Sequence, residues 1–401
     1  METIVYIGDF QCSTMSAEVQ LVLGNAAIFK ELGYKVVFIG NEFEDKEFNS
    51  IMDTHKTFLG YDLFNVPFYR GSKDIKKLNF IEKEIEFILK KYNCRFVICY
   101  GTPTFSGLLF TLKRWCRKSK IPFIINCVDL PNVSHGSFLQ RKIKRVDRIL
   151  RHWIYKNSDG IIAVSSKIAE YLLDNKYKPS IIVPPVKNLE AYRKPILEER
   201  NFIKLVYGGN PFPSDGRKVS VDGYKDRLDI AIYYVDKLID LGYKIRFDIY
   251  GLTLEQYINV VPEQYALLQK NIEHIKFHGR VAKNICEQAF SDSDYMILLR
   301  KKNLMTDAGF PTKFVESISV GTPVLITDVG DIHCYLKENI NGFFVDIEDE
   351  AKGIEQMSKA IELPLEKINI MKKQCYDSKL FDYKKYVLNM QKFLEEIHNK
   401  I

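Results

Sequence analysis

The sequence lacks the features that mark secreted, membrane-spanning and zinc-binding proteins. Its first ten residues contain no basic segment followed by an apolar core, so we do not expect a signal peptide. No stretch approaches the roughly 18 unbroken apolar residues of a spanning helix. The eight cysteines are scattered, with no CxxC pair and no histidine at zinc-finger spacing. We therefore expect buried free thiols in a protein of the reducing cytoplasm.

Size and composition favour a folded protein with two domains. The chain has 401 residues, of which 46% are hydrophobic and 27% are charged. Enough apolar surface is available to offset the chain entropy lost on folding, which excludes disorder as the main state. A chain of this length exceeds one ordinary core and suits two domains of about 200 residues each.

The positive charge is concentrated in one segment of the N-terminal half. The net charge is +7, and the segment from Thr111 to Lys156 holds 12 basic residues against two acidic ones. Within it, residues 138–156 predict a helix with an apolar stripe and a basic circumference. The stripe consists of Leu139, Ile143, Val146, Leu150 and Trp153, and the basic face includes Arg141, Lys142, Lys144, Arg145 and Arg148.

This helix suggests a partner with negative charge. We expect its apolar face to pack into the domain and its basic face to meet an anionic membrane surface. The alternative is an ordinary core-packed helix whose solvated face happens to be basic. Nucleic acid is not expected, because no recognisable reader motif accompanies the charge.

Apolar runs alternate with helical patterns in both halves of the chain. This alternation predicts an α/β fold with two doubly wound, Rossmann-like domains that face each other across a cleft. The predicted boundaries are 1–190 for the N-terminal, acceptor-binding domain, 191–202 for a linker and 203–380 for the C-terminal domain. We expect residues 381–401 to form a C-terminal helix that packs back toward the N-terminal domain.

The segment Ala308–Thr327, with sequence AGFPTKFVESISVGTPVLIT, carries the most chemical information. Pro311 favours the start of a helix, and Gly321 favours a left-handed cap at its end. A helix N-terminus after a glycine-containing loop offers free amides to phosphate oxygens. Lys313 opposes the helix dipole there, which suggests that an anion lies nearby. Glu316, one turn deeper, can accept hydrogen bonds from ribose hydroxyls; an ordinary capped helix remains the alternative.

This segment resembles the C-terminal signature of family 4 glycosyltransferases, which are retaining enzymes with the GT-B fold, of the group 1 type. The resemblance implies that Glu316 holds the ribose of a nucleotide-sugar. It also implies that Gly309, Phe310, Pro311, Thr312 and Lys313 lie against the nucleotide-sugar. Ala308 stands where the family usually has a first Glu for the donor sugar, and the adjacent Asp307 can partly replace it.

A second point of resemblance is the cation pair that holds the diphosphate. Lys225 matches the lysine position, whereas the usual arginine is absent near Gly209 and Asn210, which the resemblance places against the nucleotide-sugar. Arg217 or Lys218 in the following loop can take its place. The run Phe277–Val281 resembles a strand-end turn that borders the base, where Arg280 approaches the phosphates.

The N-terminal half matches the family more loosely. The loop Val128–Gly136 occupies the place where the family often has a histidine near the reaction centre. The resemblance implies that Asp129 or His135 faces the donor, and we take Asp129, Lys225 and Glu316 as candidate catalytic residues. The Asp292–Ser293–Asp294 string can hold a divalent cation in principle, but its place before a strand favours a structural turn.

The resemblance implies transfer of a sugar, with retention, from a UDP- or GDP-linked donor to a saccharide or polyprenyl-linked acceptor. It requires neither a metal nor a cofactor. The expected setting is bacterial surface polysaccharide synthesis, in the cytoplasm or on the inner face of the cell membrane. The alternatives are a nucleotide-sugar epimerase of the same fold and a non-catalytic partner subunit.

Overall fold

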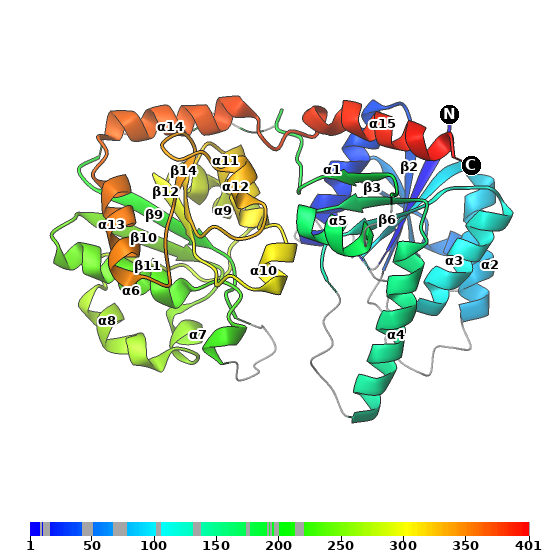
Figure 1. The fold of residues 1–401 in the computed structure, drawn as a ribbon. Coiled ribbons are helices and arrows are strands. Elements are labelled where there is room, and N and C mark those ends of the chain that lie inside the picture. The colour runs from blue at the N-terminus through cyan, green and yellow to red at the C-terminus, as the bar shows by residue number, and fades with distance from the viewer. Residues whose placement is uncertain are drawn as a thin grey trace. The chain divides into compact units, whose positions relative to one another are not determined.

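The computed structural model describes residues 1–8, 10, 17–41, 51–66, 78–101, 106–130, 138–173, 177–190, 192, 195, 200–212 and 220–400. They form two compact units (Figure 1). The first unit comprises residues 1–188, 308–310 and 382–401, and the second comprises residues 189–307 and 311–381.

The first unit contains a sheet whose strand order is β3-β4-β2-β1-β5-β6-β7-β8. Its strands are β1 (Thr3–Gly8), β2 (Lys35–Asn41), β3 (Lys56–Phe58), β4 (Tyr61–Val66), β5 (Cys94–Tyr100), β6 (Phe123–Cys127), β7 (Gly160–Ala163) and β8 (Ser180–Ile182). Its helices are α1 (Ala17–Glu31), α2 (Leu78–Lys91), α3 (Ser106–Lys118), α4 (Phe138–Lys156), α5 (Ser166–Leu173) and α15 (Val387–His398), with short 3-10 turns at Ile51–Thr54 and Tyr383–Tyr386.

The central strands of this sheet pair in parallel, as their unbroken apolar sequences predict. β1 and β6 are buried along their whole length, so both faces of the sheet are covered. The hairpin of β3 and β4 was not predicted, and it is antiparallel. Leu59 and Gly60 both adopt positive φ in its two-residue turn, which suits the twist of such hairpins.

The second unit contains a parallel sheet with the order β11-β10-β9-β12-β13-β14. Its strands are β9 (Ile203–Gly208), β10 (Ile245–Tyr250), β11 (Ile275–Phe277), β12 (Tyr295–Leu298), β13 (Val324–Ile326) and β14 (Gly342–Phe344). Its helices are α6 (Leu228–Asp240), α7 (Leu254–Ile258), α8 (Tyr265–Lys270), α9 (Lys283–Ser291), α10 (Leu304–Ala308), α11 (Thr312–Ser319), α12 (Ile332–Tyr335), α13 (Glu350–Ile361) and α14 (Leu365–Ser378), with short 3-10 turns at Val221–Gly223 and Pro262–Gln264.

The predicted α/β class with two doubly wound, Rossmann-like units is confirmed. The apolar pattern from Leu254 to Lys270 is typical of one continuous helix, but the structure divides it into α7 and α8. Pro262 starts the 3-10 turn between them, since proline lacks the amide that a continuous helix needs.

The C-terminal helix α15 is part of the first unit. It packs against α1 and β8, and its side chains Ile397 and Phe393 lie over Gly160 at the start of β7. A Cβ at position 160 would lie 2.4 Å from the Ile397 side chain, so glycine is required for this close approach.

Helix α4 buries a different face from the one its sequence predicts. Ile154 and Tyr155 are buried, and Tyr155 donates its hydroxyl to the carbonyl of Gly101. In contrast, Val146 and Trp153 of the expected core stripe are 66% and 49% exposed. Tyr155 is buried instead and Arg151 is half-buried, whereas Val146 and Trp153 face outward; Leu150 is half-buried, and the side chains of Leu139 and Ile143 lie outside the described part of the structure.

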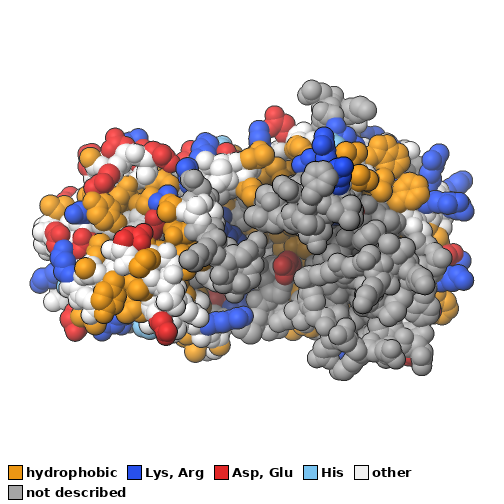
Figure 2. Space-filling model, turned by 90° about the horizontal axis from the view of Figure 1, so that it is seen from below, with side chains coloured by type: hydrophobic (Ala, Val, Ile, Leu, Met, Phe, Trp, Pro, Cys, Tyr) orange, Lys and Arg blue, Asp and Glu red, His pale blue; other side chains and the backbone are white. Residues whose placement is uncertain are grey.

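An exposed apolar row lies beside basic side chains. Ile149, which does not belong to the predicted stripe, is 60% exposed and forms an exposed apolar row with Val146 and Trp153, while Lys142 and Arg145 are exposed on the same helix. On the face that Figure 2 shows, hydrophobic side chains lie next to Lys and Arg side chains. Arg148 is half-buried, and the side chains of Arg141 and Lys144 lie outside the described part of the structure. None of the described helices has the length and hydropathy needed to cross a bilayer.

The described cysteines are free thiols, as predicted, but three of them are not buried, since Cys94 and Cys286 are half-buried and Cys334 is exposed. Cys99, Cys116, Cys127 and Cys375 are buried, and burial raises the pKa of each thiol. Cys334 lies on α12, at a position where helical spacing points it away from the buried Ile332.

A buried lysine joins α14 to the turn before β12. The Lys372 ammonium donates to the carbonyls of Ser291 and Ser293 at 2.8 and 2.7 Å, and the residue is 1% exposed. Asp294 lies nearby, where it accepts hydrogen bonds from Arg200 and from the amide of Lys204. Burial lowers the pKa of Lys372 to about 8 despite the attraction of Asp294.

We expect this lysine to make the second unit more stable as the pH rises above about 8. The unfolded lysine keeps its proton up to a pKa of about 10.4, so the unfolded state binds more protons between these values and the free energy of unfolding increases with pH. Lys372→Met removes the titrating group. The stability difference, wild type minus variant, should therefore grow by at most about 1.4 kcal/mol per pH unit, measured by urea unfolding between about pH 8 and pH 10. A difference that stays constant over this range would contradict the assignment.

Candidate functional site

The site of the second unit lies where its strand order reverses. β9 is flanked by β10, which continues the sheet in one direction, and by β12, which continues it in the other. In open α/β sheets, ligands bind outside the carboxyl ends of strands at such a switch point. Gly209 and Asn210 follow β9 at this point, and Arg300 lies just beyond β12.

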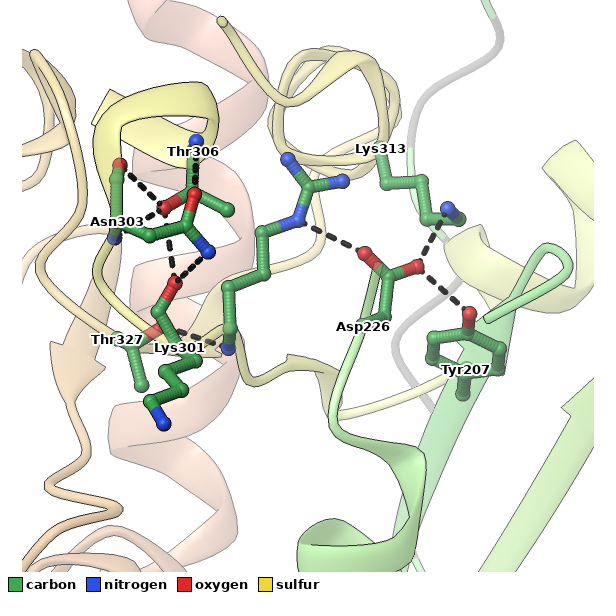
Figure 3. Close-up of polar contacts among 8 residues, drawn as sticks. Tyr207, Asp226, Lys301, Asn303, Thr306, Lys313 and Thr327 are labelled. Carbon is green, nitrogen blue, oxygen red and sulfur yellow. Dashed lines mark hydrogen bonds and ion pairs between the residues drawn. The ribbon is translucent and has the colours of Figure 1, made fainter. Parts of the chain in front are cut away.

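A buried carboxylate holds two cations together at this switch point. Asp226, in the loop before α6, is 1% exposed. Its Oδ1 accepts a hydrogen bond from Arg300 Nε at 2.8 Å, and its Oδ2 accepts one from Lys313 Nζ at 2.9 Å. The Tyr207 hydroxyl donates to the same Oδ2 at 2.7 Å (Figure 3). We call Tyr207, Asp226, Arg300 and Lys313 the Asp226 cluster.

Asp226 is ionised within this cluster. Burial by itself raises the pKa of a carboxyl group, but Lys313 and Arg300 outweigh it and hold the pKa of Asp226 well below its usual range. Burial and the neighbouring Asp226 charge raise the pKa of Tyr207 well above its usual value, so this hydroxyl keeps its proton and remains a donor.

The structure identifies an anion beside Lys313 that differs from the expected phosphate. The sequence placed Lys313 in the first turn of α11, against the helix dipole, and suggested a bound anion as the reason. That position is confirmed, but the anion bonded to Lys313 is the protein's own Asp226. Sequence spacing gave no signal for this contact, because Asp226 and Lys313 lie 87 residues apart.

Gly209 makes room for the lysine that reaches Asp226. Its φ is +141°, and a Cβ built there would lie 2.0 Å from Lys313 Cε. Lys313 Nζ also lies 5.6 Å from the centre of the Tyr207 ring. Glycine at position 209 is therefore needed both for the backbone conformation and for the passage of the lysine.

Helix α11 begins and ends as its sequence predicts. Pro311 is its N-cap residue and forms no side-chain capping hydrogen bond, and Gly321 follows the helix with φ +87°. Phe314 and Ile318 are buried in the core, as expected. Helical spacing places Thr312, Glu316 and Ser319 on one polar face, of which Thr312 and Glu316 are half-buried and Ser319 is buried.

Other predicted residues border the same edge of this unit. Lys225 precedes Asp226; its side chain is exposed and its amide donates to the carbonyl of Pro211. Arg280 is exposed in the loop after β11. The side chain of Asn210 accepts a hydrogen bond from the amide of Phe212. Gly309 and Phe310 directly precede Pro311 in the chain but belong to the first unit.

Asp307 is engaged in the fold of its own unit. Its Oδ1 accepts a hydrogen bond from the amide of Gly330, in the loop after β13, at 2.9 Å. The short helix α10 that contains it is capped by Asn303, whose side chain accepts from the amides of Met305 and Thr306. Figure 3 shows Asn303 and Thr306 beside Thr327 and Lys301. Asp307 therefore uses one carboxylate oxygen for structure.

Several predicted residues belong elsewhere. Asp129 lies in the first unit, two residues after β6, where its carbonyl accepts a contact from the Cys127 thiol. His135, Arg217 and Lys218 lie outside the described residues.

The acidic string before β12 is structural, as expected. Asp292 caps α9 and accepts from Gln288, while Asp294 binds Arg200. In the described parts of the chain, no three His, Cys, Asp or Glu side chains gather in a way that could hold a metal ion.

A pocket of about 330 Å³ lies at the carboxyl ends of β12, β13 and β14. Arg300 belongs to its lining, together with three carboxylates, Asp328, Asp346 and Glu348. Asp346 pairs with Lys352 at 2.9 Å, and this lysine and two backbone amides lower the pKa of Asp346 to about 2. Lys302 and Lys352 also line the pocket, so its three carboxylates face three cations, of which Arg300 is the buried one.

Residues 219–377 match the family described as Glycosyl transferases group 1. This segment includes Lys225, the segment Ala308–Thr327 and three members of the Asp226 cluster. The fourth member, Tyr207, lies before it. No curated protein matches the sequence.

Solved structures with the same fold cover almost the whole chain. The sucrose-phosphate synthase of Thermosynechococcus elongatus is 12% identical, with a TM-score of 0.69 and all of both chains covered. The Anabaena HepE protein, in complex with UDP, is also 12% identical, with a TM-score of 0.66 over 98% of this chain and 100% of that one. The catalytic domain of starch synthase IV from Arabidopsis thaliana, bound to ADP and acarbose, is 11% identical with a TM-score of 0.67 over 99% of each chain. Residues 219–377 thus form a group 1 glycosyltransferase domain, in a chain whose two Rossmann-like units share the fold of GT-B glycosyltransferases.

Proposed function

We propose that the protein is a glycosyltransferase that moves a sugar from a nucleoside diphosphate sugar to a saccharide or polyprenyl-linked acceptor, with retention and without a metal. The observation that carries the proposal is the family match over residues 219–377, which contains a cluster of cations at the switch point of a doubly wound sheet. The related fold of HepE in complex with UDP, and with UDP-glucose, supports a UDP-linked donor; GDP is the alternative.

The chemical task is to stabilise the charge that develops on the departing diphosphate. Lys225 and the amides at the start of α11, near Thr312, supply positive electrostatic potential at the edge of the sheet. Glu316 accepts hydrogen bonds from the ribose hydroxyls, and Arg280 approaches the phosphates from the loop after β11. Asp129 acts near the reaction centre. The acceptor attacks the face from which the diphosphate leaves, so that no protein nucleophile is needed.

Replacement of Glu316 or Lys225 should impair transfer. Glu316→Ala and Lys225→Ala should each reduce kcat/KM at least about tenfold, equivalent to about 1.4 kcal/mol, because each removes a contact to the donor. The assay uses labelled UDP- and GDP-sugars with saccharide and polyprenyl phosphate acceptors. Glu355→Ala and Lys359→Ala serve as matched controls, since these residues form an exposed pair on α13.

The same assay separates the alternatives. Wild-type turnover in both Glu316→Ala and Lys225→Ala would refute the site assignment. Release of a free or epimerised sugar without acceptor would identify an epimerase instead, and nucleotide binding without turnover would identify a non-catalytic subunit.

The proposed setting is surface polysaccharide synthesis at the inner face of the cell membrane. The supporting observation is the exposed apolar row of Val146, Ile149 and Trp153 on α4, with Lys142 and Arg145 beside it. On the neighbouring helix α3, Phe110 is 43% exposed and lies 6.4 Å from the Trp153 ring, and Arg114, Arg117 and Lys118 are exposed. Apolar side chains flanked by cations suit an interface with anionic lipid.

Both parts of this surface should be needed for membrane binding. Reversing the charges of Lys142, Arg145 and Arg148 to Glu should abolish co-sedimentation with phosphatidylglycerol vesicles, because each cation near the surface contributes about 1 kcal/mol. Changing Val146, Ile149 and Trp153 to Ser should do the same by removing the inserted apolar groups. High salt should weaken wild-type binding. Lys359→Glu with Lys367→Glu, exposed in the second unit, is the control; unchanged sedimentation of both test variants would remove the membrane assignment.

A further inference from the structure

Arg300 is a buried arginine with most of its hydrogen-bonding capacity unused. The residue is 6% exposed, and its Nε donates to Asp226. A guanidinium group has five N–H donors, of which four are on its two terminal nitrogens. Among the residues that the structure describes, neither terminal nitrogen makes a hydrogen bond, and neither is sealed from solvent as an orphaned buried atom. These donors are therefore available to a ligand.

The Asp226 cluster also has an excess of positive charge. One carboxylate, Asp226, neutralises only one of the two cations, Arg300 and Lys313, that it binds. Tyr207 keeps its proton and contributes no charge. An uncompensated charge in a low-dielectric site is costly, and an anion that binds there offsets the cost. The cluster thus favours a negatively charged occupant.

The position of the guanidinium is fixed from several sides. The amide of Arg300 donates to the Thr327 hydroxyl at 2.8 Å, which anchors the backbone after β12. Asp226 fixes the side chain, and the same carboxylate holds Lys313 in the first turn of α11. Arg300 and the first turn of α11 therefore both contact the carboxylate of Asp226. The donors of Arg300 and the amides of a helix N-terminus without a side-chain cap lie at the same end of the sheet.

The surroundings favour one side of Arg300 for an anion. The pocket on the β12–β14 side is lined by three carboxylates, Asp328, Asp346 and Glu348, and also by Lys302 and Lys352, so that its charges balance. At the carboxyl end of β9, in contrast, the neighbours are Lys313, the exposed Lys225 and the backbone of Gly209. An anion with several oxygens on adjacent phosphorus atoms can use the planar arginine, the lysine and the helix amides together.

We propose that Arg300 binds the diphosphate of the nucleotide-sugar, and that Asp226 is a positioning residue that holds Arg300 and Lys313 in place for it. This inference rests on the proposed function and adds two residues that no sequence pattern identified. Arg300, from β12, supplies the second cation that the sequence does not provide after β9. Its buried guanidinium stays charged as the diphosphate departs and stabilises the leaving group where the dielectric is low.

The test compares nucleoside diphosphates with monophosphates of the same base. Calorimetry gives the Kd values of UDP, UMP, GDP and GMP, and inorganic pyrophosphate serves as a competitor that lacks a base. Arg300→Met should weaken binding of the preferred diphosphate at least tenfold and change binding of its monophosphate by no more than twofold. Asp226→Asn should change the ratio of the diphosphate Kd to the monophosphate Kd in the same direction. A merely structural role would weaken the binding of both nucleotides equally.

Two further variants keep the test decisive. Arg300→Lys retains the charge and the partner of Asp226, and it should lie between wild type and Arg300→Met in diphosphate preference. Arg246→Met is the matched control, because Arg246 also pairs with an aspartate, Asp248, but lies near the start of β10. The ratio of the diphosphate Kd to the monophosphate Kd in this variant should equal that of wild type.

The outcomes distinguish this inference from the proposed function. If wild type prefers the diphosphate and both Arg300→Met and Arg300→Lys keep that preference in full, the inference is overturned while the proposed function stands. If wild type binds no nucleotide and transfers no sugar, the proposed function is wrong, and the inference that rests on it is wrong as well. Loss of diphosphate preference in the Arg300 variants, with unchanged melting temperatures, supports the inference.

Discussion

The site of the second unit depends on one buried carboxylate. Asp226 binds Arg300 and Lys313 from opposite oxygens and accepts a hydrogen bond from Tyr207. Without this carboxylate, two cations would share a buried site with nothing to neutralise either of them, which is far more costly than the loss of a surface ion pair. Asp226 is thus both the electrostatic centre of the site and the connection between β9, β12 and α11.

The sheet topology explains why residues so distant in sequence meet there. β9 and β12 are neighbours although β10 and β11 separate them in the chain, so the loops that follow the two strands diverge from adjacent carboxyl ends. This arrangement opens a space that helices on either face do not fill. Gly209 leaves room there for the Lys313 side chain, because a Cβ at position 209 would lie 2.0 Å from Lys313 Cε.

Identities of 11–12% with proteins of the same fold show how little of the sequence the fold requires. Buried strands such as β1 and β12 tolerate exchange among apolar residues of similar volume. Site residues have less freedom, but the same charge can be supplied from another strand. Here Ala308 and the absent arginine after β9 depart from the family pattern, while a buried arginine after β12 lies at the same switch point.

The sequence by itself determined the fold class, the two-unit organisation and the limits of α11, because periodicity, proline and glycine act locally. It also indicated Glu316 through a motif with fixed spacing, and Lys225 through its resemblance to the family's lysine position. Only the tertiary structure decided that Lys313 and Arg300 share Asp226, since contacts across 74 and 87 residues leave no trace in spacing. It likewise decided which side of α4 is buried: the apolar spacing defines a stripe, but the contacts of α4 with α3 and α5, and not the spacing itself, set which of its side chains are covered.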